Sequence, residues 1–298
     1  MNHIIPNWLK KVYPNNSIIN ASKLEGGVVS DVWRILTDTG IECVIRCTRL
    51  PADKHQVLLN LESAASIDFC LPNEIHFLAA GDSLITMYPW IPGEALYSFS
   101  DCLHEVLLTL SQKHAQPGFY SVRSIYSNAF EEARYVQENI DDFYNVLSPE
   151  IIRGVHKAAS AVLTSLTKKK LNLLLDCRGR LTHGDPKPAN VIRSNNMLTF
   201  IDWDKICTLS PESDIVYALF TGSIPYTLDI RRIFEEFGKI DDLSFSIFSL
   251  ATKHLPDLYL IHDVYIYLVH NVRQKYISEQ VFPLWLSWKE KYFEILGD

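Results

Sequence analysis

The sequence of 298 residues predicts an α+β fold with two lobes, a small β-rich N-terminal lobe and a large, mainly helical C-terminal lobe. Two observations predict it. Short runs of β-branched and apolar residues dominate the chain up to about residue 92, and helical periodicity dominates the remainder. The two parts meet at a segment that contains Pro89, Pro92 and Gly93, residues that break regular secondary structure. We therefore expect the lobes to comprise residues 1–92 and 93–298.

Composition and charge exclude several classes of protein. Apolar residues make up 47% and charged residues 21% of the chain, which is typical of globular domains. The net charge of -7 and the lack of a sustained basic run argue against a nucleic-acid partner. No apolar stretch reaches membrane-spanning length, and the first residues lack a signal-peptide pattern. The six cysteines show no zinc-ligand spacing, so we expect reduced thiols in a cytoplasmic protein without a membrane partner.

The N-terminal part begins with a predicted hairpin. Residues 32–35 and 42–46 are short β-rich runs, separated by a turn at residues 37–40. Apolar spacing predicts one helix over residues 54–66, and residues 84–88 are typical of a buried strand. Strands around one helix would form the small lobe.

The last third of the chain predicts long helices. Apolar residues recur at spacings of three and four over residues 258–272, which indicates the buried stripe of a helix. Trp285 and Trp288 continue this spacing. Packing in the core is the favoured interpretation of both tryptophans, and an aromatic wall of a substrate site is the alternative.

The densest chemical information lies in residues 181–192, Leu-Thr-His-Gly-Asp-Pro-Lys-Pro-Ala-Asn-Val-Ile. Two prolines and a glycine keep this segment out of a helix. The strand-like runs 191–193 and 197–201 come next, with a polar turn between them, and they predict a hairpin that ends at Asp202. Because a hairpin brings its ends together, we expect Asn190 and Asp202 to lie side by side.

Three oxygen-bearing side chains, those of Asp185, Asn190 and Asp202, should therefore converge. An Asp and an Asn offer the hard oxygen ligands that Mg²⁺ bound to a nucleotide requires. Asp185 could accept a proton from an attacking hydroxyl or orient it. Taken singly, each residue would suit a turn or a strand end, but their combination favours a catalytic centre.

The pattern His-Gly-Asp-x-x-x-x-Asn, followed by Ile-Asp-Trp, resembles the aminoglycoside phosphotransferase and choline kinase families, which are relatives of protein kinases. The resemblance implies a protein-kinase-like fold and the transfer of a phosphoryl group from ATP, with Mg²⁺, to a hydroxyl of a small molecule. It implies that Asp185 is the catalytic base and that Asn190 and Asp202 hold magnesium. His183 would buttress the loop, and Lys187 would contact the transferred phosphate as a point charge.

The resemblance extends toward the N-terminus. Gly26, Gly27 and Ser30 lie in a segment that resembles the family's nucleotide loop, where glycines let backbone amides approach phosphates. Residues 87–93 resemble the hinge between the lobes. There the Pro89 carbonyl would accept from adenine and the Ile91 amide would donate to it.

Four further residues match family positions less directly. Arg46 matches a cation that pairs with the nucleotide's phosphates, and an exposed strand arginine is the alternative. Its expected partner on the following helix is Gln56, at a position where the family has a glutamate. The nearest glutamate in this sequence is Glu62. His114 is expected to be structural. Asp214 matches an aspartate that anchors the catalytic loop, with a helix N-cap as the competing interpretation.

The acceptor and the reaction itself keep alternatives. The resemblance allows an aminoglycoside, an amino alcohol or another hydroxylated molecule. The acidic residues Glu235, Glu236, Asp241 and Asp242 would attract a cationic acceptor, although a solvated helix face explains such a cluster as well. The alternative function is a non-catalytic, kinase-like nucleotide-binding protein, motivated by Arg46 and the uncertain glutamate.

Overall fold

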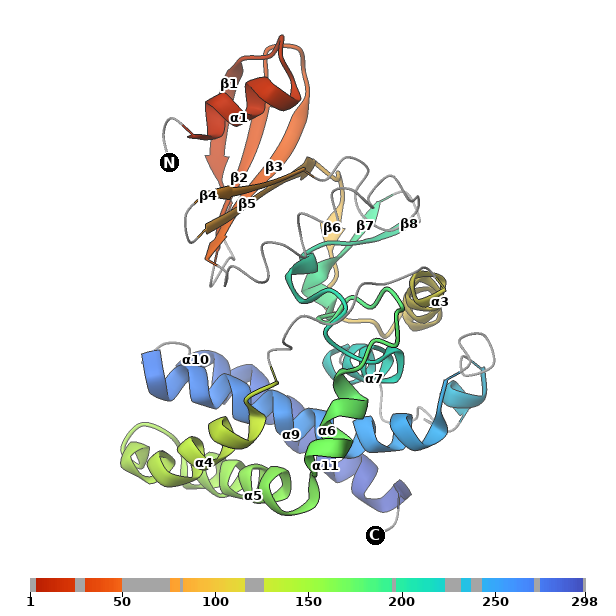
Figure 1. Cartoon of the computed structure of the whole chain (residues 1–298). Coiled ribbons are helices and arrows are strands. Elements are labelled where there is room, and N and C mark those ends of the chain that lie inside the picture. The colour runs from red at the N-terminus through yellow and green to blue at the C-terminus, as the bar shows by residue number, and fades with distance from the viewer. Residues whose placement is uncertain are drawn as a thin grey trace. The chain divides into compact units, whose positions relative to one another are not determined.

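The computed structural model has strands in its N-terminal part and helices in its C-terminal part, which confirms the predicted α+β class (Figure 1). It describes residues 4–24, 30–49, 76–80, 83–115, 126–194, 197–222, 232–236, 243–270 and 274–296. The helix predicted over residues 54–66 lies outside these ranges. Within the described part of the chain, no helix has the length and the apolar character needed to cross a membrane.

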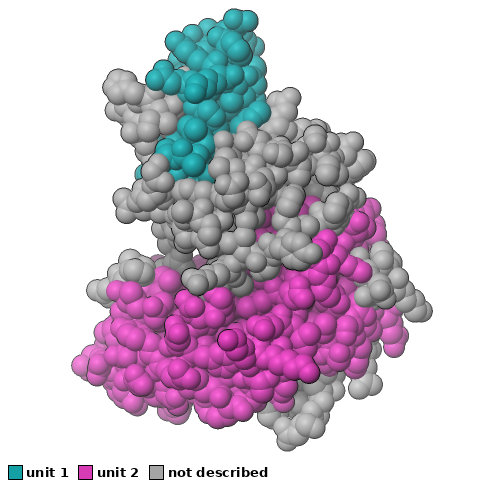
Figure 2. Space-filling view, viewed as in Figure 1, with its two compact units in different colours: residues 1–94, 192–201 teal, residues 95–191, 202–298 magenta. Residues whose placement is uncertain are grey.

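The chain forms two compact units, each built from two separate stretches of sequence (Figure 2). The first unit contains residues 1–94 and 192–201, and the second contains residues 95–191 and 202–298. Residues 192–201 thus group with the first unit by contacts, although they lie far from residue 94 along the chain. The division into lobes at residue 92 stays a prediction.

An antiparallel sheet of five strands, in the order β1-β2-β3-β5-β4, forms most of the first unit. Its strands are β1 (Ile18–Lys23), β2 (Ser30–Thr37), β3 (Glu42–Arg49), β4 (His76–Ala80) and β5 (Ser83–Pro89). β2 and β3 form the predicted hairpin, with Val32 opposite Arg46. β5 confirms the strand predicted over residues 84–88.

Helix α1 (Ile4–Val12) supplies the apolar cover for this sheet. Its Trp8 and Leu9 share a buried cluster with Cys43, Ile45 and Met87 of the sheet. Burial raises the pKa of the Cys43 thiol to about 11, so that this thiol stays protonated at neutral pH. The cysteines among the described residues are free thiols, as expected from their spacing.

A second sheet has the strand order β6-β7-β8, formed by β6 (Glu94–Ala95), β7 (Val191–Ser194) and β8 (Met197–Phe200). β7 and β8 are the hairpin predicted over residues 191–201. Gly93 precedes β6 with φ +151°, and a Cβ at this position would lie 2.3 Å from the carbonyl oxygen of Arg193. A residue without a side chain is therefore required where these two segments meet.

The second unit is helical. Its elements are α3 (Leu103–His114), α4 (Ala129–Asn139), η1 (Ile140–Phe143), α5 (Pro149–Ser165), α6 (Lys168–Leu175), α7 (Pro211–Thr221), α9 (Phe245–His270), α10 (Gln274–Tyr276), η4 (Ile277–Val281) and α11 (Phe282–Leu296). Helix α9 packs against α4, α5, α7 and α11 (Figure 1). Because several neighbours surround it, α9 is apolar over more than one face.

Helix α9 confirms the helix predicted over residues 258–272 as far as it is described, but not every residue of the predicted stripe. Leu258 and Ile261 are buried, whereas Tyr265 and Leu268 are only half-buried. The spacing of three and four identified the correct element and missed the breadth of its buried surface. Contacts with several other helices determine that breadth, and the sequence of α9 does not contain them.

Trp285 and Trp288 of α11 are buried in the helical core, which confirms the favoured interpretation. The indole N–H of Trp285 donates to Asp257 Oδ1 at 2.8 Å, and that of Trp288 donates to the carbonyl of Thr252 at 3.0 Å. Both indoles therefore bury their rings while satisfying their one polar group.

An ion pair between the partly exposed Arg178 and the buried Glu212 fixes the start of α7. Glu212 is fully buried, and Nη2 of Arg178 donates to its two carboxylate oxygens at 2.8 and 2.6 Å. The backbone N–H of Ser244 donates to the same carboxylate at 2.7 Å. Removing the arginine would leave a buried charge without its main partner.

Arg178→Ala is therefore expected to lower the free energy of unfolding by about 3 kcal/mol. Urea denaturation followed by circular dichroism measures this change. Arg178→Lys keeps the positive charge but loses the planar guanidinium, so we expect an intermediate loss. An unchanged midpoint for Arg178→Ala would show that the pair contributes nothing.

Candidate active site

The carboxylate of Asp214 in α7 anchors the loop that precedes β7. Its Oδ2 accepts from the backbone N–H of His183, and its Oδ1 accepts from that of Gly184, each at 2.8 Å. Nε2 of His114 lies 3.2 Å from Oδ2, and both side chains of this pair are fully buried. The predicted anchoring role of Asp214 is confirmed, as is the structural role of His114. Ser210, not Asp214, caps α7.

Gly184 lets this loop pack directly on the segment after β8. Its φ is +80°, a conformation that glycine adopts at little cost. A Cβ here would lie 1.8 Å from the carbonyl oxygen of Lys205 and 2.6 Å from Oγ1 of Thr208. The backbone before Asp185 and the backbone of Lys205 are therefore in close contact.

His183 supports the loop from the other side, as expected. Its ring packs on that of Trp203, with centroids 4.4 Å apart. Its Nδ1 accepts from the backbone N–H of Asp185 at 3.2 Å. Lys113, also buried, places its ammonium 5.1 Å from the centre of the Trp203 ring. These contacts fix the backbone at Asp185 without engaging its carboxylate.

The carboxylate of Asp185 is buried and asymmetrically bonded. Three donors lie near Oδ2: Nζ of Lys187 at 3.1 Å, Nδ2 of Asn190 at 3.3 Å and Nζ of Lys205 at 3.3 Å. Among the described residues, Oδ1 is buried without a hydrogen-bond partner. Three donors thus hold Oδ2, and the hydroxyl of Tyr217 also acts on this carboxylate, while Oδ1 lacks a partner at hydrogen-bond distance in the described part of the chain.

Asp185 is ionised despite its burial. Burial alone would raise its pKa, but the ammonium groups of Lys205 and Lys187 and the hydroxyl of Tyr217 lower it more, so that the pKa lies well below its ordinary value. Burial lowers the pKa of Lys187, but Asp185 and Asp202 raise it above its ordinary value. The carboxylate and this ammonium therefore both stay charged at neutral pH.

Asn190 and Asp202 offer two further oxygens near this carboxylate. Nδ2 of Asn190 also donates to the carbonyl of Asp185 at 2.9 Å, which leaves the amide oxygen for a cation. Asp202 is half-buried and adopts the left-handed conformation, with φ 64° and ψ 61°. The negative charge of Asp202 raises the pKa of Lys187, so Asp202 lies near the lysine that contacts Asp185.

The candidate nucleotide residues of the N-terminal part are only partly described. Gly26, Gly27, Gln56 and Glu62 lie outside the described residues. Ser30 begins β2. For these five residues, the roles implied by the family resemblance stay predictions.

Three other candidates lie on the five-stranded sheet or directly after it. Arg46 is half-buried in β3, where it pairs with Val32 of β2 and with Thr86 of β5. Pro89 ends β5, and Ile91 lies in the loop that leads to β6. The predicted strand ended at Arg46, whereas β3 continues to Arg49. The roles of these three residues in binding a nucleotide stay predictions.

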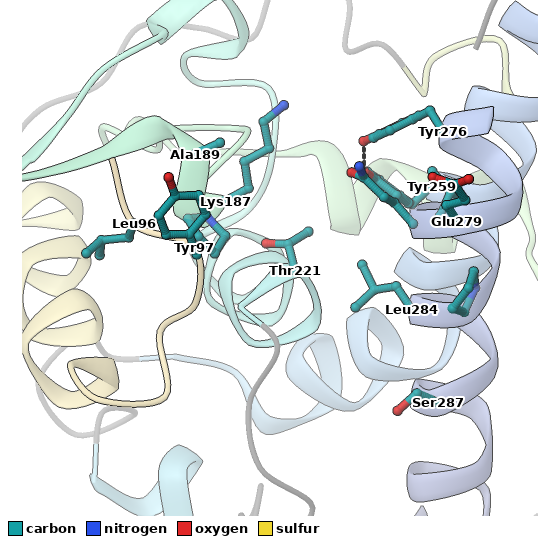
Figure 3. Close-up of a pocket in the computed structure, with 14 residues that line it drawn as sticks. Leu96, Tyr97, Lys187, Ala189, Thr221, Tyr259, Tyr276, Glu279, Leu284 and Ser287 are labelled. Carbon is teal, nitrogen blue, oxygen red and sulfur yellow. Dashed lines mark hydrogen bonds between the residues drawn. The ribbon is translucent and has the colours of Figure 1, made fainter. Parts of the chain in front are cut away.

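A pocket of about 570 Å³ lies beside Lys187 in the second unit (Figure 3). Tyr97 and Lys187 lie on one side of it, and Tyr259, Tyr276 and Glu279 lie on the opposite side. It is also lined by Leu96, Pro188, Ala189, Thr221, Gln280, Val281, Pro283, Leu284 and Ser287. Among these lining residues, Glu279 is the one carboxylate and Lys187 the one cation.

Two tyrosines of the pocket form a pair. The hydroxyls of Tyr259 and Tyr276 lie 2.8 Å apart (Figure 3). Burial, together with the charge of nearby Asp263, raises the pKa of both hydroxyls. They therefore stay neutral and can exchange hydrogen bonds with a bound molecule. The pocket combines aromatic faces, neutral hydroxyls and a single negative charge.

Sequence reasoning missed Lys205, Tyr217 and Glu279. None belongs to a local motif, and each reaches the site through the folding of distant segments. Of the acidic residues predicted to attract a cationic acceptor, the two that the structure describes do not line the pocket. Glu235 and Glu236 are exposed, while Asp241 and Asp242 lie outside the described residues.

A comparison with known families decides the class of protein. The model of the phosphotransferase enzyme family matches residues 20–244. The chain belongs to this family. The predicted assignment to an enzyme that transfers phosphoryl groups is thereby confirmed. A search of curated proteins gave no significant match for this phosphotransferase.

Solved structures with the same fold cover nearly the whole phosphotransferase. A spectinomycin phosphotransferase in complex with ADP and spectinomycin is 15% identical, with a TM-score of 0.58 over 96% of this chain and 93% of that one. A choline kinase from Cryptosporidium parvum is 13% identical, with a TM-score of 0.61 over 99% and 97% of the chains. The GDP complex of an aminoglycoside phosphotransferase is 16% identical, with a TM-score of 0.60 over 98% of both. The TM-scores show that these proteins share the fold of this chain, and at identities of 13–16% they show the fold alone.

Proposed function

We propose that this phosphotransferase transfers the γ-phosphoryl group of ATP to a hydroxyl of a small molecule, with Mg²⁺. The observation that supports this most directly is the carboxylate of Asp185. It is buried and ionised, and its Oδ1 has no partner among the described residues. It lies 3.1 Å from the ammonium of Lys187, which lines the pocket. A substrate hydroxyl is the donor that this oxygen would accept.

Asp185 is the proposed base. The oxygen of the acceptor forms a bond to the γ-phosphorus while the bond from that phosphorus to the β,γ-bridging oxygen breaks and ADP leaves. The hydroxyl proton passes to Oδ1 of Asp185. Since phosphoryl transfer needs little covalent participation by the protein, the orientation of the hydroxyl is the main contribution of this residue.

Lys187 is the proposed contact for the transferred group. Its raised pKa keeps it charged, and its position at the pocket lets it approach phosphate oxygens. Its charge would balance the negative charge that gathers on these oxygens in the transition state.

Asn190 and Asp202 are the proposed ligands of Mg²⁺. Their side chains provide an amide oxygen and a carboxylate, and Mg²⁺ prefers such hard donors. When bound, the ion would neutralise charge on the nucleotide's phosphates. No group of three or more His, Cys, Asp and Glu side chains in the described part of the chain forms a metal site by itself. The nucleotide and water would therefore complete the coordination.

The first unit is the proposed source of nucleotide contacts. Arg46 would pair with phosphates, and the Pro89 carbonyl and Ile91 amide would bind adenine. Further contacts would come from Gly26, Gly27, Ser30 and Gln56. ATP and GTP both need testing, since one relative binds ADP and another GDP.

The pocket favours an acceptor that carries one positive charge. Glu279 would pair with an ammonium group, and the faces of Tyr97, Tyr259 and Tyr276 would attract it further. Because Glu279 lies across the pocket from Lys187, an ammonium beside Glu279 would direct the rest of the molecule toward Lys187 (Figure 3). An amino alcohol matches this single carboxylate better than a molecule with several charges.

A screen for nucleoside diphosphate release tests the proposal. ATP or GTP is offered with choline-like alcohols, aminoglycosides, thiamine and sugars, and Asp185→Asn serves as the control. Release that depends on an acceptor and disappears in Asp185→Asn would support it. Nucleotide binding without release for any acceptor would instead favour the non-catalytic alternative.

Glu279→Gln is expected to raise the KM of a cationic acceptor up to about fivefold, because Glu279 is exposed and an exposed ion pair contributes about 1 kcal/mol or less. The KM of an uncharged acceptor and kcat should change little. Steady-state kinetics with both acceptors measures this difference. Glu290→Gln is the matched control, since Glu290 is exposed on α11 outside the pocket. Equal effects on both acceptors would exclude a charge interaction.

A further inference from the structure

Two lysines from different segments approach the same oxygen of Asp185. Nζ of Lys187 lies 3.1 Å from Oδ2, and Nζ of Lys205 lies 3.3 Å from it. Lys187 belongs to the loop of Asp185, whereas Lys205 ends the short helix η3 (Trp203–Lys205) after β8. The family motif predicts the first lysine, and no motif predicts the second.

The two lysines differ in their surroundings. Lys187 lines the pocket, and Lys205 does not. The backbone of Lys205 is fixed, because its carbonyl packs on Gly184 and accepts from the N–H of Thr208 at 3.2 Å. Lys205 therefore reaches Asp185 from a rigid base, while Lys187 adjoins the space that a substrate would enter.

The charges at this carboxylate are unequal. Two ammonium groups face one carboxylate, so one of them can pair with another anion while Asp185 keeps a partner. An incoming phosphoryl group offers strong acceptor oxygens and competes for the ammonium at the pocket, which is Lys187.

We propose that Lys205 is a positioning residue that stays on Oδ2 of Asp185 when Lys187 turns to the phosphoryl group. It thereby keeps the side chain in one orientation, with Oδ1 presented to the acceptor hydroxyl. Asn190 assists through its weaker contact with Oδ2. This inference rests on the proposed function and assigns a role to a residue outside the catalytic motif.

Steady-state kinetics of Lys205→Met and Lys205→Arg tests the role. Lys205→Met is expected to lower kcat about 10- to 100-fold, since a small misplacement of a reacting group has effects of this size. The KM values for nucleotide and acceptor should change less than about threefold, because Lys205 does not line the pocket. Lys205→Arg keeps a charge and should restore most of kcat.

Lys289→Met is the matched control for the loss of an ion pair. Nζ of Lys289 lies 2.7 Å from the buried carboxylate of Asp257, away from Asp185. Its substitution should lower the midpoint of thermal unfolding and leave kcat unchanged. Lys205→Met should show the opposite pattern when both are assayed below their unfolding temperatures.

Several outcomes would overturn the inference. A wild-type kcat in Lys205→Met would show that Lys187 alone is enough to orient Asp185. A loss of kcat that Lys205→Arg does not restore, together with a fall in unfolding temperature like that of Lys289→Met, would show a purely structural role. If the unmodified chain transfers phosphate to no acceptor, the proposed function fails as well. If it is active and Lys205→Met is equally active, only this inference fails.

Discussion

Asp185→Ala is expected to lower kcat for phosphoryl transfer about 10³-fold and to leave nucleotide binding largely intact. Oδ1 of this carboxylate, which is buried without a hydrogen-bond partner among the described residues, is the proposed acceptor of the proton. Without this carboxylate, the ammonium groups of Lys187 and Lys205 would lose the negative charge that both of them contact. The nucleotide contacts proposed for the first unit would remain.

Single-turnover kinetics and calorimetric titration of nucleotide separate these two expectations. Asp185→Asn keeps the shape of the side chain and should lose about as much activity as Asp185→Ala. Asp142→Ala is the control, because Asp142 is exposed in η1. Full turnover in Asp185→Ala would refute the assignment of the base, and loss of nucleotide affinity would show a role in binding instead.

Asp214→Ala is expected to lower the free energy of unfolding by about 4 kcal/mol and kcat about 100-fold. The substitution removes the acceptor of the backbone N–H groups of His183 and Gly184 and the partner of His114. Each buried donor left without a partner costs about 1–3 kcal/mol. The loop would also lose the contact that fixes the backbone before Asp185.

Chemical denaturation and kcat of the folded protein measure both effects. Asp214→Asn should be intermediate, because one of its two oxygens becomes an amide nitrogen that faces a backbone N–H. Asp176→Asn is the control, since Asp176 comes directly after α6 at an exposed position. Wild-type stability of Asp214→Ala would mean that the loop keeps its conformation without this anchor.

The loop of the candidate active site could be predicted from sequence because its pattern is local. Gly184, Asp185 and Asn190 lie close together along the chain, and the hairpin after them has a two-strand pattern of its own. Asp214 was predicted through the family motif, since nothing in its own segment indicates that it bonds to the loop. Short-range patterns thus determined which elements form the site.

Contacts between distant segments could not be predicted in this way. Lys205 reaches Asp185 because Gly184 allows two backbones to meet, and Glu279 reaches the pocket through the packing of η4. Arg178 and Glu212 form a partly buried pair although each is an ordinary charged residue in its own segment. Such pairs depend on how distant segments pack, and the spacing of charges along one segment does not predict that packing.

The close approach of Gly93 to Arg193 bears on how this chain can diverge. The first unit needs residues 192–201 as well as residues 1–94, so no single crossover in the gene exchanges it whole between relatives. A hybrid joined at residue 94 would combine a glycine from one parent with a facing backbone from the other. We therefore expect that folded chimaeras take residues 1–94 and residues 192–201 from the same parent.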